Sequence, residues 1–184
     1  STPTVLERNC VHIIPLMERL RLPAGVDARA NPKSSSGRLD IFVRIIADGA
    51  ATFDEIPVGY DGPLYAEVVP RSFPVIAKAG SRLAQIRFRE DVPHAPAARQ
   101  VAVTIDLDPA GKDGGVIGYR ARRTSGLVDL AKVGVLSRAD YWEPIVTRPE
   151  RPELVLDPDE FYILASGEAV IVGADEAAEM IAYD

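Results

Sequence analysis

The sequence is poor in the residues on which several kinds of functional site depend. It has one cysteine, Cys10, and two histidines, His12 and His94, in 184 residues. A single cysteine excludes a disulfide within the chain and is typical of a protein from a reducing compartment. Zinc sites need three or four nitrogen, sulfur or carboxylate ligands at suitable spacing, and the sequence indicates none. A Ser-His-Asp triad is not indicated either.

Long apolar runs and an excess of positive charge are also missing. No stretch approaches the roughly 18–20 apolar residues that a membrane-spanning helix needs, and no secretory signal is visible. The formal net charge is −6, which argues against a general nucleic-acid-binding protein. We therefore expect a cytoplasmic protein that binds neither membranes nor nucleic acid. A small anionic ligand in a local basic pocket remains compatible with this charge.

Prolines and glycines, by contrast, are frequent. The 15 prolines and 14 glycines divide the chain into short segments rich in Val, Ile, Leu, Phe and Tyr. This spacing is typical of many short strands and predicts an all-β fold. Strands are expected over Val11–Pro15, Leu39–Ile46, Leu64–Val69, Val75–Ala77, Leu83–Phe88, Val101–Leu107, Val116–Tyr119, Phe161–Leu164 and Ala169–Val172. Short helices are expected over Pro15–Arg21, where a strand and turn fit equally well, Gly126–Val133 and Ala174–Met180.

A polar, Pro/Ala-rich stretch over residues 91–100 indicates a linker between residues 1–90 and residues 101–184. The two parts carry a faint internal repeat with an offset of 150, which aligns Val11–Ile14 with Phe161–Leu164. The chain opens Ser-Thr-Pro without a methionine. We expect a piece of a longer protein, in which residues 101–184 begin a second copy of the first unit.

The segment from Asn31 to Asp40 reads Asn-Pro-Lys-Ser-Ser-Ser-Gly-Arg-Leu-Asp. Three hydroxyls and a glycine lie between Lys33 and Arg38, and such a segment offers a phosphate chain directional donors and compensating charge. A solvated loop between two strands fits the local sequence as well, because the segment matches neither the P-loop nor the dinucleotide fingerprint.

Glu67 stands out among the acidic residues because it interrupts an apolar strand pattern, Leu64–Val69. With a period of two, Glu67 shares a face with Tyr65 and opposes Ala66. A desolvated carboxylate makes an effective general base near neutral pH, whereas a solvent-facing glutamate is the structural alternative. On the strand after the serine segment, Arg44 could meet Glu67 or a phosphate.

Four motifs follow one another in a characteristic order: Lys33–Leu39, then Ala47, then Gly59–Gly62 leading to Glu67, then Gly80-x-x-Leu83-x-Gln85-Ile86. Together they resemble the dCTP deaminase family, the zinc-independent deaminases of the trimeric dUTPase superfamily. The resemblance implies an all-β, dUTPase-like distorted barrel or jelly roll with a few short helices. Residues 101–184 are similar to the opening part of a second such copy, as in the bacterial members with two fused copies.

The resemblance implies four catalytic residues. Glu67 corresponds to the glutamate that takes a proton from water as the water attacks C4 of cytosine, and that then delivers protons to the ring and to the leaving ammonia. Ser34 corresponds to the serine that helps to hold this water, and Arg38 to the arginine beside the reacting base. Ala47 corresponds to a position whose main chain cradles the cytosine and the water.

The resemblance also implies substrate-binding roles for Lys33, Ser35, Ser36, Tyr60 and Gln85, with Lys33 and Ser35 on the triphosphate. The expected ligands are dCTP, its product dUTP and the related nucleotide dTTP. Mg²⁺ is expected to arrive on the triphosphate, without protein ligands and without zinc. The family also implies a homo-oligomer with a trimer-like arrangement, in which active sites form between subunits.

Two positions favour deamination over dUTP pyrophosphate cleavage. Pro57 stands where a dUTPase carries the aspartate that activates water, and Glu67 stands where a dUTPase has an aliphatic residue. A dUTP pyrophosphatase, a bifunctional enzyme and a non-catalytic nucleotide-binding module remain alternatives. The segment 48–58 is several residues longer than in single-copy deaminases, and Gly49 replaces a family arginine for which Arg44 could substitute.

Overall fold

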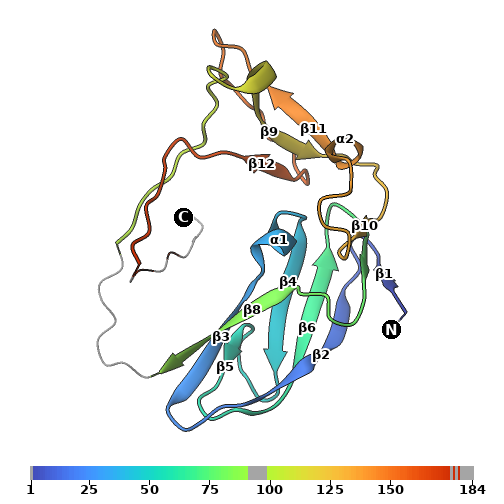
Figure 1. Cartoon of the computed structure of the whole chain (residues 1–184), viewed down its shortest axis with the longest axis vertical. Coiled ribbons are helices and arrows are strands. Elements are labelled where there is room, and N and C mark those ends of the chain that lie inside the picture. The colour runs from blue at the N-terminus through green and yellow to red at the C-terminus, as the bar shows by residue number, and fades with distance from the viewer. Residues whose placement is uncertain (1, 91–98, 175, 177, 179–184) are drawn as a thin grey trace.

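The computed structural model describes residues 2–90, 99–174, 176 and 178, and its regular elements are nearly all strands (Figure 1). The all-β prediction is confirmed. The strands are β1 (Thr4–Leu6), β2 (His12–Arg21), β3 (Val26–Pro32), β4 (Ile41–Ala47), β5 (Glu55–Ile56), β6 (Asp61–Pro70), β7 (Val75–Ala77), β8 (Ala84–Glu90), β9 (Val116–Ala121), β10 (Val128–Asp129), β11 (Trp142–Val146) and β12 (Tyr162–Leu164). The helices are α1 (Ser34–Gly37), α2 (Arg138–Tyr141) and the 3₁₀ turn η1 (Asp113–Gly115).

Two three-stranded sheets form the body of the molecule, in the orders β2-β6-β4 and β5-β3-β8. Both contribute to one hydrophobic core, to which β3 supplies Ala28 and Ala30 and β4 supplies Val43 and Ile45. Along β4 and β6, buried and half-exposed side chains alternate, as expected for strands with one face on a core. Each of these strands therefore has an outward face that is free to carry polar side chains.

The register of the first sheet around Glu67 is set by both neighbouring strands, although the pairing of β2 with β6 shifts between Pro15 and Arg19. In β6, Glu67 lies opposite Ile13 of β2 on one side and opposite Arg44 of β4 on the other. Because side chains alternate with a period of two, a slip of one residue would place the apolar set of β6 on the outside and Glu67 in the core. Burial of Ala66 and its apolar neighbours therefore keeps Glu67 on the outward face.

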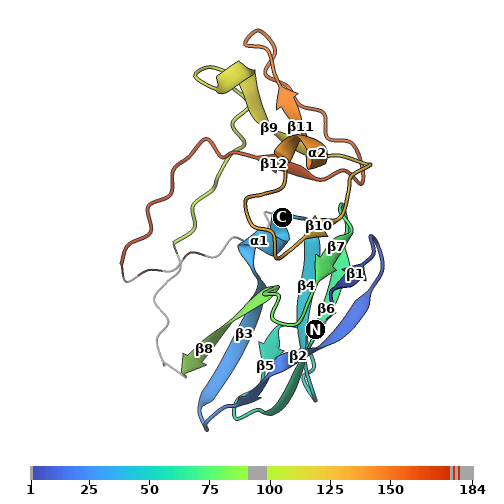
Figure 2. The ribbon, with the colours of Figure 1, turned by 45° about the vertical axis from the view of Figure 1, so that its right-hand side comes forward.

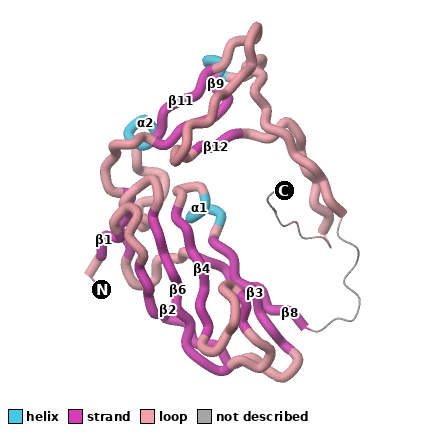
Figure 3. Tube along the Cα trace, turned by 180° about the vertical axis from the view of Figure 1, so that it is seen from behind, coloured by secondary structure: helices cyan, strands magenta, loops and turns pink. Residues whose placement is uncertain are grey.

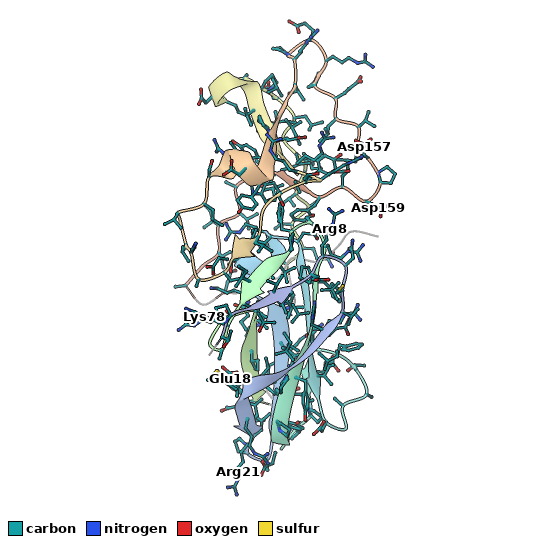
Figure 4. All side chains as sticks on the ribbon, turned by 90° about the vertical axis from the view of Figure 1, so that its right-hand side faces the viewer. Arg8, Glu18, Arg21, Lys78, Asp157 and Asp159 are labelled. Carbon is teal, nitrogen blue, oxygen red and sulfur yellow. The ribbon has the colours of Figure 1, made fainter. Side chains whose placement is uncertain are left out.

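The later part of the chain joins the body through a shared sheet and shared aromatic packing. Val128–Asp129 of β10 pairs in parallel with β7, in a sheet of order β1-β7-β10. Phe73 is completely buried, and its ring contacts Tyr141 and Trp142 with centroid separations of 5.8 and 5.2 Å. The guanidinium of Arg8 donates to the carbonyl of Arg123 at 3.0 Å, and Figure 4 shows Arg8 where the two parts meet.

The upper sheet, of order β11-β9-β12, extends into two chain segments that lie side by side away from the body (Figures 1 and 2). These segments were expected to be strands over Val101–Leu107 and Ala169–Val172. That expectation is wrong, because only an isolated bridge from Ile105 to Ser166 forms there. Apolar side chains such as Ile105 and Ile171 stay exposed, so no burial drives a longer ladder.

Two helix predictions are also corrected. The segment Pro15–Arg21 belongs to β2, the strand alternative for this segment, because it pairs with the beginning of β6. The segment Gly126–Val133 contains β10 and turns rather than a helix. The helix expected over Ala174–Met180 and the linker expected over 91–100 fall largely outside the described residues. Within the described part of the chain, no helix is long and apolar enough to cross a membrane.

Candidate active site

The serine segment forms a single helical turn, α1, between β3 and β4 (Figure 3). Ser36 is 3% exposed, and its hydroxyl donates to the carbonyl of Leu83 at 2.8 Å. The backbone N–H of Lys33 donates to the same carbonyl at 2.9 Å. These two bonds fasten α1 to the start of β8. The hydroxyl of Ser36, predicted to bind substrate, is therefore engaged inside the protein.

The other polar groups of the segment are more accessible. Lys33, Ser34 and Arg38 are exposed, and Ser35 is half-buried. The guanidinium of Arg38 donates from Nη2 to Ser34 Oγ at 3.3 Å, and from Nε to the Ser34 carbonyl at 3.4 Å. The structure therefore brings these predicted site residues together as one surface cluster of hydroxyl and cationic donors.

Asp40 fixes the turn from α1 into β4. Its backbone has a positive φ of 53°, and its carboxylate accepts a hydrogen bond from the Ser72 hydroxyl at 2.7 Å. Its carbonyl accepts the backbone N–H of Arg71 at 2.9 Å. Burial raises the pKa of the Asp40 carboxyl, while the Ser72 hydroxyl opposes that rise. The aspartate thus connects the serine segment to the end of β6.

Glu67 lies in the middle of β6, on the outward face. It is half-buried, whereas Ala66 and Val68 on either side of it are buried. Among the described residues, Glu67 takes part in no ion pair and no side-chain hydrogen bond. Its cross-strand neighbour Arg44 is close enough in register for an ion pair, since directly opposed Cβ atoms in a sheet lie about 4.5–5.5 Å apart.

Two aromatic rings hold the guanidinium of Arg44 instead. Its central carbon lies 4.5 Å from the ring centroid of Phe42 and 4.9 Å from that of Phe53. A cation–π contact at an exposed site is worth about 0.5–1 kcal/mol, and an exposed ion pair about 0–1 kcal/mol. Two such contacts together match or exceed one exposed ion pair, and no ion pair between Arg44 and Glu67 forms among the described residues.

Phe53 reaches this position because the loop that contains it is hydrogen-bonded to β4 through the next residue, Asp54. Ile45 donates its backbone N–H to Asp54 Oδ1 at 2.8 Å, and Asp54 returns its own N–H to the Ile45 carbonyl at 2.8 Å. Asp54 has a positive φ of 65°, a conformation that aspartate tolerates better than most residues. Burial raises the pKa of its carboxyl, with Arg44 and Arg29 acting in the opposite direction.

Ala47 and Tyr60 are packed together at the far end of β4. Ala47 is buried opposite Leu64. The phenolic oxygen of Tyr60 accepts the backbone N–H of Asp48 at 3.1 Å and donates to the carbonyl of Pro63. Tyr60, predicted to bind substrate, is thus engaged in holding the main chain beside Ala47. Gln85 is exposed on β8.

The predicted site residues are spread along β4 rather than gathered in one pocket. Arg44, which marks the level of Glu67, lies three residues from Ile41 and three from Ala47, or about 10 Å each way at the usual strand rise. The turn α1 precedes Ile41 at one end of the strand. Two cavities, of 680 and 270 Å³, lie in the region of β9, β11 and β12, and no predicted site residue lines either.

Sequence models of two domains cover the chain. The N-terminal domain of 2'-deoxycytidine 5'-triphosphate deaminase matches residues 1–92, and the C-terminal domain of the same deaminase matches residues 67–184. This chain belongs to the dCTP deaminase family. The resemblance to this family within the dUTPase-like superfamily is therefore confirmed.

A solved structure supports the same assignment. It is described as 2'-deoxycytidine 5'-triphosphate deaminase from Agrobacterium tumefaciens, and it shares 48% sequence identity with this chain at a TM-score of 0.85. The match covers 94% of this chain and 57% of the other. This member of the dCTP deaminase family therefore spans less than two thirds of the length of that relative. A search among curated proteins gave no match.

Two residues of this family member were missed by sequence reasoning. Phe42 reads as an ordinary strand residue, and Phe53 lies in the segment 48–58, for which the resemblance implied extra length. Their exposure, 39% and 45%, and their shared contact with Arg44 appear only in the folded chain. The length implied for this segment pointed to a feature of its own, but it did not indicate which side chain would contact Arg44.

In the described part of the chain, no group of three or more His, Cys, Asp or Glu side chains could hold a metal ion. The site instead offers one carboxylate, Glu67, and the donors of the cluster at Lys33, Ser34 and Arg38. Such a set can activate water and bind an anion without a resident metal.

Proposed function

We propose that the protein deaminates dCTP to dUTP and ammonia, with Glu67 as the general base. The observation that carries the proposal is a carboxylate held on the outward face of β6, unpaired among the described residues, in a chain of the dCTP deaminase family. The relative with 48% identity is itself described as a dCTP deaminase. Pro57 supports deamination over pyrophosphate cleavage, because it offers no carboxylate to activate water there.

In the proposed reaction, Glu67 takes a proton from a water molecule while the water oxygen attacks C4 of cytosine. The resulting tetrahedral carbon carries the new hydroxyl and the original amino group. Glu67 delivers its proton to the ring nitrogen, takes the hydroxyl proton and passes a proton to the amino group. The C–N bond then breaks, ammonia leaves and the C4 carbonyl of uracil forms. Ser34 and the main chain at Ala47 are proposed to hold the water, and Arg38 to lie beside the base.

The surface cluster at α1 is proposed to bind the triphosphate. Lys33 and Ser35 provide a cation and a hydroxyl, which suit phosphate oxygens. Mg²⁺ enters as part of the substrate complex, since magnesium prefers phosphate and water oxygens to an all-protein cage. Gln85, which lies opposite Asn31 near the end of β3, is proposed to extend this surface.

A second copy of the fold is proposed to complete the site. Glu67 lies about 10 Å along β4 from Ile41, and α1 lies beyond that residue. A single nucleotide bound within one chain would have to span that length of the outward face. In the proposed trimer-like homo-oligomer, α1 of one subunit lies beside Glu67 of another subunit. The phosphate-binding donors and the general base then act on the same nucleotide.

The first test is Glu67→Gln in the intact protein, with ammonia release from dCTP as the measurement. Removal of a general base costs about 10²–10⁴-fold, so a loss of that order in kcat is expected. Glu18→Gln is a matched control, because Glu18 is an exposed glutamate of β2 that Figure 4 shows on the body surface. Near-normal ammonia release from the Glu67 variant would contradict the assignment.

Product analysis with dCTP and, separately, with dUTP as substrate separates the alternatives. A deaminase gives dUTP and ammonia from dCTP, and a dUTP pyrophosphatase gives dUMP and pyrophosphate from dUTP. A bifunctional enzyme gives dUMP, ammonia and pyrophosphate from dCTP. Thermal stabilisation by dCTP with Mg²⁺ but without any product would instead identify a nucleotide-binding module. Pyrophosphate release without ammonia, or nucleotide binding without any product, would overturn the proposed reaction.

A further inference from the structure

We infer that Phe42 and Phe53 act as positioning residues, which hold Arg44 out of an ion pair with Glu67 and so keep the carboxylate available to water. This inference rests on the proposed function, because it assigns a role around the proposed base. It concerns two rings to which neither the sequence motifs nor the proposed phosphate binding assigns a role.

The first step is that the fold forces Arg44 and Glu67 to be neighbours. They are directly opposed residues of β4 and β6, and both project from the outward face of the same sheet. The buried residues on the other face fix this register, so neither side chain can be moved away by a local shift of the strand. An arginine in this place is a ready ion-pair partner for a carboxylate.

The second step is that the cation is already bound elsewhere. Arg44 lies 4.5 Å from the ring centroid of Phe42 and 4.9 Å from that of Phe53. Phe42 is two residues before Arg44 on the same strand, so its ring shares the outward face. Phe53 comes from the loop after β4, and the hydrogen bonds between Asp54 and Ile45 hold that loop in place.

The third step concerns what an ion pair would do to the base. A carboxylate paired with a guanidinium accepts hydrogen bonds from its N–H groups. It does so through the same lone pairs that must accept the proton of water. Holding Arg44 on the two rings keeps its positive charge near the proposed nucleotide while leaving Glu67 unoccupied. The long loop 48–54 gains a function in this arrangement, because it delivers Phe53.

The experiment compares the effect of one substitution in two backgrounds, by steady-state kinetics of ammonia release in the intact protein. Phe53→Ala should lower kcat at least tenfold with KM changed less than threefold, because Arg44 is released to pair with Glu67. In an Arg44→Met background, the same substitution should lower kcat less than threefold. Phe53→Leu, which keeps apolar bulk without a ring, serves if the alanine variant does not fold. Phe88→Ala removes an exposed ring that makes no cation–π contact among the described residues, and it should leave kcat unchanged.

An equal loss of kcat in both backgrounds would show a merely structural role for Phe53 and would overturn the inference, as would no loss in either. A crystal structure of Phe53→Leu gives a readout independent of activity. The inference predicts an Arg44–Glu67 nitrogen–oxygen distance within 4 Å in that variant, and a guanidinium that remains apart from Glu67 overturns it. Absence of ammonia release from the unmodified protein would instead overturn the proposed function, while the crystallographic result would still decide the inference.

Discussion

Gly62 packs against Tyr60 at the far end of β4, where a larger residue would not fit without a shift. A Cβ atom built at this position would lie 2.5 Å from the phenolic oxygen of Tyr60 and 2.7 Å from Cζ of its ring. The Tyr60 hydroxyl in turn holds the backbone N–H of Asp48. The glycine is therefore required by the close approach of a buried tyrosine, rather than by its backbone angles.

Gly62→Ala should destabilise the protein by about 1–3 kcal/mol, the usual cost of overpacking a core. Urea unfolding followed by circular dichroism measures this change. Gly37→Ala is the matched control, because a Cβ at Gly37 meets no atom within 4 Å. Equal unfolding midpoints for the two variants would show that Tyr60 can move away freely, contrary to its packed position.

At the same scale, the sequence identified Glu67 correctly as a carboxylate within an apolar strand. A period of two is a local property, so the outward direction of Glu67 could be read from Leu64–Val69 alone. The identity of its neighbour could not, because pairing with Arg44 depends on two strands more than twenty residues apart. The hydrogen bond of the Ser36 hydroxyl could not be predicted either, because its acceptor, the Leu83 carbonyl, lies 47 residues away in the sequence.

At the scale of elements, β9 and β11 are linked by charge as well as by their ladder. Arg120 and Glu143 are opposed in register, and their Nη2 and Oε2 atoms lie 2.7 Å apart. Arg122 Nη1 lies 3.2 Å from the other oxygen of Glu143. The hydrogen bond from Arg120 holds the pKa of the Glu143 carboxyl below its ordinary value.

This lowered pKa predicts a pH-dependent contribution to stability. A carboxyl whose pKa is lower in the folded than in the unfolded state stabilises the fold above its unfolded pKa, and that stabilisation is lost as the pH falls through the folded pKa. Glu143→Gln should therefore lower the Tm at pH 7, and the difference from the unmodified protein should shrink as the pH approaches 3. Thermal unfolding across this range measures it, and a difference that is constant with pH would contradict the prediction.

Element predictions failed where local pattern and long-range pairing disagree. β3 was missed because its buried residues are alanines, Ala28 and Ala30, which give little strand signal. The sequence of Pro15–Arg21 is compatible with a short helix, but the segment forms a strand because it pairs with β6. The serine segment was expected as a loop and forms the turn α1, closed by hydrogen bonds to Lys33 and Ser34.

At the scale of the whole molecule, one aromatic cluster connects the body to the later part of the chain. Phe73 from the segment between β6 and β7 packs edge-on against Tyr141 and Trp142. Trp142 also contacts Phe161, with ring centroids 6.0 Å apart. Because the chain has a single tryptophan, the fluorescence of Trp142 reports on this junction alone.

Phe73→Ala should destabilise the protein by about 3–5 kcal/mol, as expected when a fully buried phenylalanine leaves a cavity. The tryptophan emission of the folded variant should move to longer wavelength as water reaches the junction. Phe88→Ala, which removes an exposed ring, is the control for both measurements. An unchanged emission maximum and unfolding midpoint in the Phe73 variant would show that the junction does not depend on this ring.

The sequence by itself determined the all-β class, the order of the four motifs and the family to which the chain belongs, because these depend on residue types and local spacing. It also placed Glu67 on a strand, since alternation is readable within six residues. Only the tertiary structure decided that Arg44 opposes Glu67, that Phe42 and Phe53 hold that arginine, and that Phe73 joins the two parts of the chain. These features depend on register and on the docking of distant segments, which are fixed by burial of the whole core rather than by any one stretch of sequence.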